Sequence, residues 1–254
     1  MKVISIQSGS NGNSIFIDAD KARFLIDAGV SAKQVEERLA LYGYRSTDIT
    51  GVLISHDHSD HMRSAGIYQR KWNVPLYVTS KTINTAIRRY DLGVLRDLRF
   101  FKSGDTLQFE TIKIETIPTP HDATDGVAFV IDTGRSRLGV LTDLGHVFDG
   151  LRSLMPTLDA AILESNYDPK MLALGRYPVY LKKRIQGPRG HLSNFESAHL
   201  VRDFGQKLKW VCLAHLSEEN NEPDLALSTH KDIVGHRLPI HIAKRYESTG
   251  VFEI

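Results

Sequence analysis

The feature that most constrains this chain is a cluster of histidines and aspartates directly after an apolar segment. Gly51-Val52-Leu53-Ile54-Ser55 is predicted to form a buried strand, and it leads straight into His56-Asp57-His58-Ser59-Asp60-His61. Metal sites need several lone-pair donors that converge from a rigid element. In an extended loop His56 and His58 project to the same side, whereas Asp60 and His61 begin the next helix. Four donors in six residues therefore predict a site for two metals, and such donors suit zinc, manganese or iron.

Further donors stand at the ends of predicted strands downstream. His121 lies just past a strand at 111–117, Asp143 ends one at 138–142, and His215 ends one at 210–214. Folds of the α/β type place their chemistry at the carboxyl ends of strands. Each of these residues alone is more often structural, but together with the cluster they predict a dinuclear centre. The histidines outside these motifs are expected to be structural: His199, His230, His236 and His241.

Composition places the chain among ordinary globular proteins and excludes several classes. Its 254 residues are enough to bury a sizeable core, and the net charge of +2 excludes a grossly basic DNA-coating protein. The single cysteine, Cys212, excludes an intramolecular disulfide framework, and it is expected to lie in the core. No apolar run approaches the length of a membrane span or of a signal-peptide core. We expect a cytoplasmic enzyme that does not bind membranes.

The order of predicted elements suggests one continuous domain without repeats or linkers. Strands are predicted at 3–7, 14–18, 23–27, 51–55, 75–79, 111–117, 127–132, 138–142, 158–163 and 210–214. Helices are predicted from Ser31 to about Gly43, from the histidine cluster to about Trp72, and at 80–90, and the final third is mostly helical. This α/β (α+β) pattern fits an αββα sandwich or a doubly wound sheet, and periodicity alone does not choose between them.

The H-x-H-x-D-H motif, followed by His, Asp and His at strand ends, resembles the metallo-β-lactamase fold superfamily. The resemblance covers most of the chain and implies a four-layer αββα sandwich with two divalent metal ions at one edge. It implies that His56, His58 and His121 bind one metal, and that Asp60, His61 and His215 bind the other. Asp143 would bridge the two metals. Asp27, at the end of an early strand, matches an aspartate that orients ligands, although a plain turn former would look the same.

Segments after Asp143 resemble one branch of that superfamily. Glu164-Ser165-Asn166-Tyr167, Gly190-His191-Leu192-Ser193-Asn194 and Ala214-His215-Leu216-Ser217 resemble segments of ribonuclease Z-like phosphodiesterases. The chain is more similar still to the YycJ/WalJ-type branch, which it resembles in Ser8-Gly9-Ser10-Asn11-Gly12-Asn13, in Tyr177-Pro178 with Leu181-Lys182 and Arg184-Ile185, in Gly190-His191-Leu192-Ser193-Asn194, and in His215-Leu216-Ser217 with Asn220-Asn221. Members of that branch are regarded as metal-dependent 5′-to-3′ exonucleases acting on DNA. Only 27 positions separate Glu164 from His191, too few for an inserted β-CASP domain. The resemblance therefore implies a single hydrolase domain over residues 1–254 that takes a nucleic acid, with DNA favoured over RNA.

Elementary electrostatics also points to a phosphodiester substrate. Ser193 and Glu196 have capping-box spacing, so His191 lies beside a predicted helix N-terminus, which favours an anion. The segment from Arg176 to Arg189 carries five cations and no acid, so it can follow a phosphate backbone, although a solvated helix face has the same composition. The residues expected to contact substrate are Arg176, Tyr177, Lys182, Arg184 and Ser193.

The expected reaction is attack of a hydroxide held between two metals on the scissile phosphate. Asp60 would also orient the hydroxide, and His191 would stabilise the phosphate oxygen or protonate the leaving group. Asp57 and Glu164 are expected to fix histidine tautomers, although Asp57 fits a solvent-exposed loop residue equally well. The alternatives are a small-molecule hydrolase of the same fold, acting on a cyclic phosphodiester, thioester or lactone, and a non-catalytic scaffold. The sequence leaves a homo-oligomer open.

Overall fold

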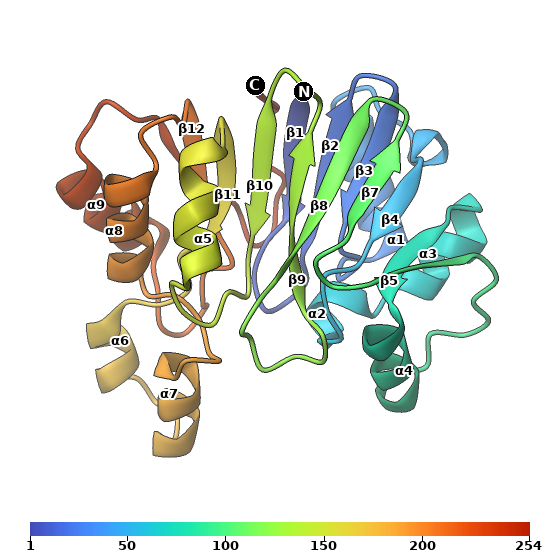
Figure 1. The fold of residues 1–254 in the computed structure, drawn as a ribbon. Helices are drawn as coiled ribbons and strands as arrows, with labels where there is room; N and C mark the ends of the chain where they lie inside the picture. The colour runs from blue at the N-terminus through green and yellow to red at the C-terminus, as the bar shows by residue number, and fades with distance from the viewer.

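The computed structural model describes residues 1–254 and contains two seven-stranded sheets that face each other (Figure 1). Sheet I has the order β14-β1-β2-β3-β4-β5-β6, and sheet II has the order β13-β12-β11-β10-β9-β8-β7. The strands of sheet I are β1 (Lys2–Gln7), β2 (Ser14–Ala19), β3 (Ala22–Ile26), β4 (Gly51–Leu53), β5 (Leu76–Thr79), β6 (Leu98–Phe101) and β14 (Phe252–Glu253). The strands of sheet II are β7 (Thr106–Phe109), β8 (Ile112–Pro118), β9 (Val127–Asp132), β10 (Arg137–Leu141), β11 (Ala160–Glu164), β12 (Trp210–Ala214) and β13 (Ile240–Ile242).

Helices cover the outer face of each sheet, so that the molecule has four layers (Figure 1). The helices beside sheet I are α1 (Ala32–Ala40), α2 (Ser59–Met62), α3 (Ala65–Trp72) and α4 (Ser80–Arg89). Those beside sheet II are α5 (Asp149–Leu154), α6 (Pro169–Leu174), α7 (Val179–Gln186), α8 (Asn194–Phe204) and α9 (Pro223–Val234). Short 3₁₀ turns lie at Ser46–Asp48 and Met155–Thr157. No helix has the length and apolar character that crossing a membrane requires.

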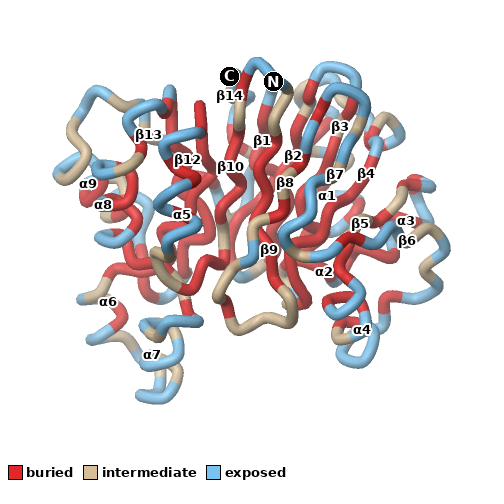
Figure 2. Tube along the Cα trace, viewed as in Figure 1, coloured by how far each residue is buried: buried red, intermediate tan, exposed pale blue.

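Both faces of the central strands are buried because neighbouring side chains enter different cores (Figure 2). In β11, Ala160 and Ile162 pack between the two sheets, whereas Ala161 and Leu163 pack under the helices of sheet II. Successive side chains of a strand point to opposite faces, and a strand covered on both sides therefore becomes a continuous apolar run. Cys212 of β12 lies in the core between the sheets, as predicted. The αββα sandwich is confirmed, and the doubly wound sheet is excluded.

Several element boundaries differ from those predicted. The helix expected from the histidine cluster to Trp72 is two helices, because the chain turns at Arg63 and Ser64 between α2 and α3. Helix α1 ends at Ala40 instead of about Gly43. The strands expected to end at Asp27 and Ser55 end at Ile26 and Leu53. Strands β6 and β7 were not predicted, because each has only four residues and most of these are exposed or half-buried.

The strand directions bring one set of chain ends to a single edge of the sandwich. In sheet I, β3, β4 and β5 are parallel, and in sheet II, β10, β11 and β12 are parallel. Strand β8 is antiparallel to β9, which is antiparallel to β10, so β8 runs with β10. The segments after all these strands therefore meet at the same edge, which we call the site edge. Helices α4 and α7 project beyond it on opposite sides of the sandwich (Figure 1).

Candidate metal centre

The structure brings all seven predicted metal ligands together at the site edge. Their donor atoms fall into overlapping groups within which every pair of atoms lies within 4.8 Å. One group is His56, His58 and His121, and another is Asp60, His61 and His215. Asp143 shares a third group with His56 and His61, and a fourth with Glu164, His191 and His215. The carboxylate of Asp143 thus lies between the two predicted triads.

Individual distances give the centre its shape. Nε2 of His61 lies 3.3 Å from Oδ2 of Asp143 and 3.4 Å from Oδ2 of Asp60. Nε2 of His121 lies 3.6 Å from Oδ1 of Asp143 and 3.4 Å from Nδ1 of His58. Such spacings are too long for good hydrogen bonds between most of these atoms, but they suit atoms that share a cation.

Three residues at strand ends adopt left-handed backbone conformations that turn their side chains into the centre. Asp27, Asp143 and His215 follow β3, β10 and β12, with φ of +66°, +55° and +57°. Asp, Asn and His are enriched among the non-glycine residues that tolerate this region, which otherwise costs strain. Gly29 supports the same turn, since a Cβ there would lie 1.6 Å from the carbonyl oxygen of Asp60.

A hydrogen-bond chain that starts at Asp27 fixes the tautomers of two histidines. The Asp27 carboxylate accepts from the Ser55 amide (2.7 Å), from the Ser55 hydroxyl (2.8 Å) and from Nδ1 of His61 (2.7 Å). Because the Ser55 hydroxyl donates its only proton to Asp27, Nδ1 of His56 must donate to Ser55 at 2.9 Å. Both histidines then carry their proton on Nδ1 and present a bare Nε2 lone pair to the centre.

Glu164 organises the opposite side of the centre. Its Oε1 accepts from Nδ1 of His191 at 2.7 Å and lies 3.3 Å from Nδ1 of His215. Its Oε2 accepts from the backbone amides of Leu144 and Leu192 at 3.1 and 3.2 Å. This fully buried carboxylate therefore contacts two imidazole rings, and its role in fixing their tautomers stays a prediction.

The buried charges perturb one another strongly. Burial lowers the pKa of His56 well below its usual range, and the positive charges of His61, His58 and His121 lower it further. Burial also opposes the charge of His61, but Asp143, Asp27 and Asp60 outweigh burial and raise its pKa well above the ordinary value. The same kind of balance raises the pKa of His215 to about 10. Carboxylates and imidazoles packed this densely and this deeply are typical of functional sites.

The residues present fit metal ions on a specific structural ground. Buried polar atoms nearly always have a hydrogen-bond partner, and each exception needs an explanation. Nε2 of His56, Nε2 of His215 and Oδ2 of Asp143 are buried without one, and all three point into the centre. Nδ1 of His121 donates to the Gly190 carbonyl at 2.9 Å, so Nε2 is the nitrogen of this ring that faces the centre. These orphaned atoms are the donors that a divalent cation requires, and on His215 a cation would displace the proton that the neighbouring carboxylates favour.

Of the five residues predicted to contact substrate, two have free side chains and three already contact other parts of the protein. Arg176 and Tyr177 form no ion pair or hydrogen bond, and Arg176 is exposed. Lys182 donates to the Ala173 carbonyl at 2.7 Å, and Arg184 pairs with Asp122. Ser193 is buried and its hydroxyl is engaged in the capping box with Glu196, as the spacing predicted.

Asp57 was expected either to fix a histidine tautomer or to lie exposed on a loop, and the structure shows neither. It is fully buried, so it is not a solvent-exposed loop residue. Its carboxylate accepts from Arg89 at 2.6 Å and from the Thr124 amide at 2.7 Å, and it forms no hydrogen bond to a histidine. Asp57 thus ties α4 to the loop that carries His121, and it does not hold an imidazole directly.

Two residues at the centre were missed by sequence reasoning. The Asn13 side-chain nitrogen lies 3.0 Å from Nε2 of His61 and 3.2 Å from Oδ2 of Asp60. Oδ1 of Asp122 lies 3.3 Å from Nε2 of His121 and 3.7 Å from Nε2 of His58. Asn13 ends a turn rich in Gly and Ser, and Asp122 directly follows a predicted ligand. Those positions were the only available signals.

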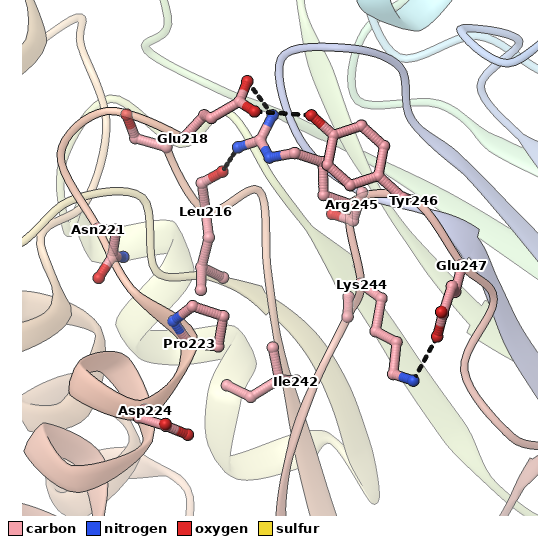
Figure 3. Close-up of a pocket in the computed structure, with 13 residues that line it drawn as sticks. Leu216, Glu218, Asn221, Pro223, Asp224, Ile242, Lys244, Arg245, Tyr246 and Glu247 are labelled. Carbon is pink, nitrogen blue, oxygen red and sulfur yellow. Dashed lines mark hydrogen bonds and ion pairs between the residues drawn. The ribbon is translucent and has the colours of Figure 1, made fainter.

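A cavity of about 620 Å³ opens beside the centre, between the segment after His215 and residues 242–247 (Figure 3). Leu216, Pro223, Ile242 and Ala243 give it an apolar lining. Four of its five charged residues are paired with one another, Lys244 with Glu247 at 2.7 Å and Arg245 with Glu218 at 3.7 Å, and Asp224 is unpaired (Figure 3). Ser8 joins the cavity to the centre, because it lines the cavity and its hydroxyl accepts from the His215 amide at 2.8 Å.

Comparisons with known proteins agree with this architecture. Residues 22–215 match the sequence profile of the Beta-lactamase superfamily domain. The chain is 34% identical over 223 residues to a Bacillus anthracis protein named exodeoxyribonuclease YycJ, covering 87% of this chain and 84% of the relative. It is 34% identical over 227 residues to exodeoxyribonuclease WalJ of Streptococcus pneumoniae, covering 88% and 84%. Among solved structures, the metallo-β-lactamase fold protein YhfI of Bacillus subtilis superposes with a TM-score of 0.75 at 17% identity, covering 98% of each chain, which shows a shared fold.

Proposed function

Since the chain belongs to the family of the Beta-lactamase superfamily domain, we propose that it is a metal-dependent phosphodiesterase that digests DNA from the 5′ end. The observation that carries the proposal is the convergence of seven donor residues beside His191, three of which have buried donor atoms without a hydrogen-bond partner. Two relatives at 34% identity, each covered over 84% of its length, carry the name exodeoxyribonuclease. We also propose that residues 1–254 act as one hydrolase domain without an inserted β-CASP domain.

The donor set favours two divalent cations, with zinc or manganese first and iron also compatible. His56, His58 and His121 would hold one cation, Asp60, His61 and His215 the other, and Asp143 both. Divalent ions in such a pair supply a water of lowered pKa and offset the negative charge of a phosphate. Asp27 and Ser55 hold the proton of the neutral His56 and His61 rings on Nδ1, so that Nε2 of each ring would face a cation.

His191 is the residue best placed to act on the substrate. Its Nδ1 donates to Glu164, its side chain is partly exposed, and it precedes the N-terminus of α8. With Nδ1 donating to Glu164, the doubly protonated ring presents an Nε2–H that can donate to a phosphate oxygen or hand its proton to the leaving sugar oxygen. Asp60 is also partly exposed, and its carboxylate could orient the attacking water. Arg176 and Lys183, whose side chains form no ion pair, would hold the phosphate backbone.

The test follows the release of nucleotides from linear duplex DNA labelled at the 5′ or the 3′ end. Metal-loaded wild type should release the 5′ label first. Asp143→Asn keeps a residue that tolerates the left-handed backbone but removes the charge shared by both triads, so it should abolish the release. Single-stranded DNA and RNA of the same sequence, run in parallel, measure the preference for DNA. No release from any nucleic acid, with the bound metal confirmed by elemental analysis, would overturn the proposal.

A second candidate is a hydrolase of small molecules, and the cavity beside His215 favours it. Its volume of about 620 Å³ and its apolar lining suit a small ligand better than a polyanion (Figure 3). Cleavage of a cyclic phosphodiester, a thioester or a lactone by the metal-loaded protein that releases no nucleotides would favour this reading.

A further inference from the structure

Helix α4 has the features of a nucleic-acid contact, although sequence reasoning gave it no function. It begins at the end of β5, so it starts at the site edge, and it projects beyond that edge (Figure 1). Its buried face consists of Thr82, Ile83 and Ala86. The helix carries Lys81, Arg88 and Arg89 and no acidic residue.

A single loop links α4 to the metal centre. This loop, residues 121–126, starts with the predicted ligand His121. The Thr82 hydroxyl donates to the Thr124 carbonyl at 2.8 Å, and Lys81 lies 3.9 Å from Asp125. The position of α4 is therefore fixed relative to a predicted metal ligand.

The same loop also holds the basic segment around α7 on the other side. Arg184 pairs with Asp122, and the Asp122 amide donates to the Arg189 carbonyl at 3.0 Å. The loop contacts the α7 segment through Asp122 and contacts α4 through residues 124 and 125. These contact points are at most three residues apart in the chain, a length that spans at most about 11 Å. One strand of nucleic acid can therefore touch both helices as it crosses the metal centre.

Only cations that are not already paired with a carboxylate of this protein are free to bind phosphate. Lys81 faces Asp125, Arg89 pairs with Asp57 at 2.6 Å, and Arg184 pairs with Asp122. The side chain of Arg88 is exposed and forms no ion pair or hydrogen bond, and the same is true of the side chains of Lys183 and Arg189 on the opposite side. The whole chain carries a net charge of only +2, so unpaired cations on both sides of one site are a local concentration of charge.

The fold of α7 agrees with a surface that a partner covers. None of its eight residues is buried, and Val179 and Tyr180 are 68% and 74% exposed. An isolated helix of this length is marginal in water, so α7 depends on the polar contacts that hold it to the site edge. Exposed tyrosine beside free cations suits bases and phosphates of a single strand.

From these contacts we propose that α4, the 121–126 loop and the α7 segment form one continuous surface for a nucleic-acid strand. Arg88 binds a backbone phosphate on the side of the metal centre away from α7. This inference rests on the proposed function, because it assumes a polynucleotide substrate. It adds that the protein contacts the substrate strand on both sides of the metal centre.

The test measures binding of a fluorescent single-stranded phosphorothioate 20-mer, which resists hydrolysis, by metal-loaded protein at several salt concentrations. Each phosphate contact contributes about 0.7 to the slope of log affinity against log salt. Arg88→Ala should therefore lower the slope by about 0.7 and weaken binding about eightfold at 50 mM and about threefold at 200 mM salt. Arg88→Lys, which keeps the charge, should bind like wild type.

Arg237→Ala is the matched control. Arg237 is also exposed and unpaired, but it precedes β13 and so lies at the opposite edge of sheet II. It should leave both slope and affinity unchanged. Hydrolysis of bis(p-nitrophenyl) phosphate, which is too short to reach α4, should be equal in wild type and in all three variants.

The outcomes separate the inference from the proposed function. If Arg88→Ala binds the 20-mer with the slope of wild type, or if Arg88→Lys loses the same affinity as Arg88→Ala, α4 is not a phosphate contact. If wild type itself binds no polynucleotide at any salt while it still cleaves the small phosphodiester, the nucleic-acid substrate is wrong, and the inference is overturned with it.

Discussion

Asp27→Asn tests whether the carboxylate behind the centre controls metal binding through histidine tautomers. The native carboxylate accepts three hydrogen bonds, from the Ser55 amide, the Ser55 hydroxyl and Nδ1 of His61. An asparagine has one accepting oxygen. If that oxygen faces the Ser55 amide, the side-chain NH₂ faces His61, whose Nδ1 must then accept, and the proton moves to Nε2, the proposed metal ligand. If the oxygen faces His61 instead, the NH₂ group faces the buried Ser55 amide, and two hydrogen-bond donors then point at each other.

Either orientation loses at least one hydrogen bond to a charged acceptor, which is worth about 1.5–3 kcal/mol. That range corresponds to metal affinity about 10- to 150-fold weaker, in line with the 10- to 100-fold effect of removing a group that orients a metal ligand. Asparagine tolerates the left-handed backbone of Asp27, so the substitution adds little strain. Competition with a chromophoric zinc chelator measures the affinity directly.

Asp20→Asn is the matched control for this prediction. Asp20 also has a left-handed backbone, with φ of +58°, but it lies on the exposed turn between β2 and β3, where it pairs with Arg135. It should leave metal affinity unchanged. Zinc affinity of Asp27→Asn within twofold of wild type, in a protein that keeps its fold by circular dichroism, would refute the tautomer argument.

Three further perturbations test other parts of the structure. Gly29→Ala should prevent the metal centre from assembling, because its Cβ would overlap the carbonyl of Asp60, and bound zinc should fall severalfold by elemental analysis. Glu164→Gln should lower the rate of nucleotide release at saturating substrate about 10- to 100-fold, because the two imidazoles it orients lose a charged acceptor; an unchanged rate would contradict that role. Burial lowers the pKa of His230 to about 4, so the unfolded chain takes up a proton near pH 6.5 that the folded chain refuses. Stability from urea unfolding should therefore be complete above about pH 6.5 and fall by up to about 3 kcal/mol on the way to pH 4, whereas His230→Gln should lack this part of the slope.

Much of the site could be predicted because its donors stand at positions that short-range patterns reveal. The motif from His56 to His61 follows an apolar strand, and His121, Asp143 and His215 each follow another. Strand ends in a parallel arrangement meet at one edge, so residues far apart in sequence could be assigned to one centre before the fold was known. The buried Cys212 and the capping box at Ser193 were accessible for the same reason, since both follow from local spacing.

Other features depended on contacts that no local pattern encodes. The boundary between α2 and α3 and the weak strands β6 and β7 follow from what packs beside them. Asp57 looked like a partner for its neighbouring histidines, but the fold turns it toward Arg89 and Thr124. Arg184 looked like a free phosphate contact, but Asp122 lies within reach and occupies it.

The sequence by itself determined the identity of the donors and the strand ends from which they come, because alternation and turn chemistry are properties of neighbouring residues. Only the tertiary structure decided which nitrogen of each histidine is free, which cations are already paired, and that α4 and α7 share one loop. Those properties depend on hydrogen bonds and ion pairs between segments distant in the chain, for example Asp27 with His61 and Arg89 with Asp57. The geometry of such pairs exists only after the two sheets have packed.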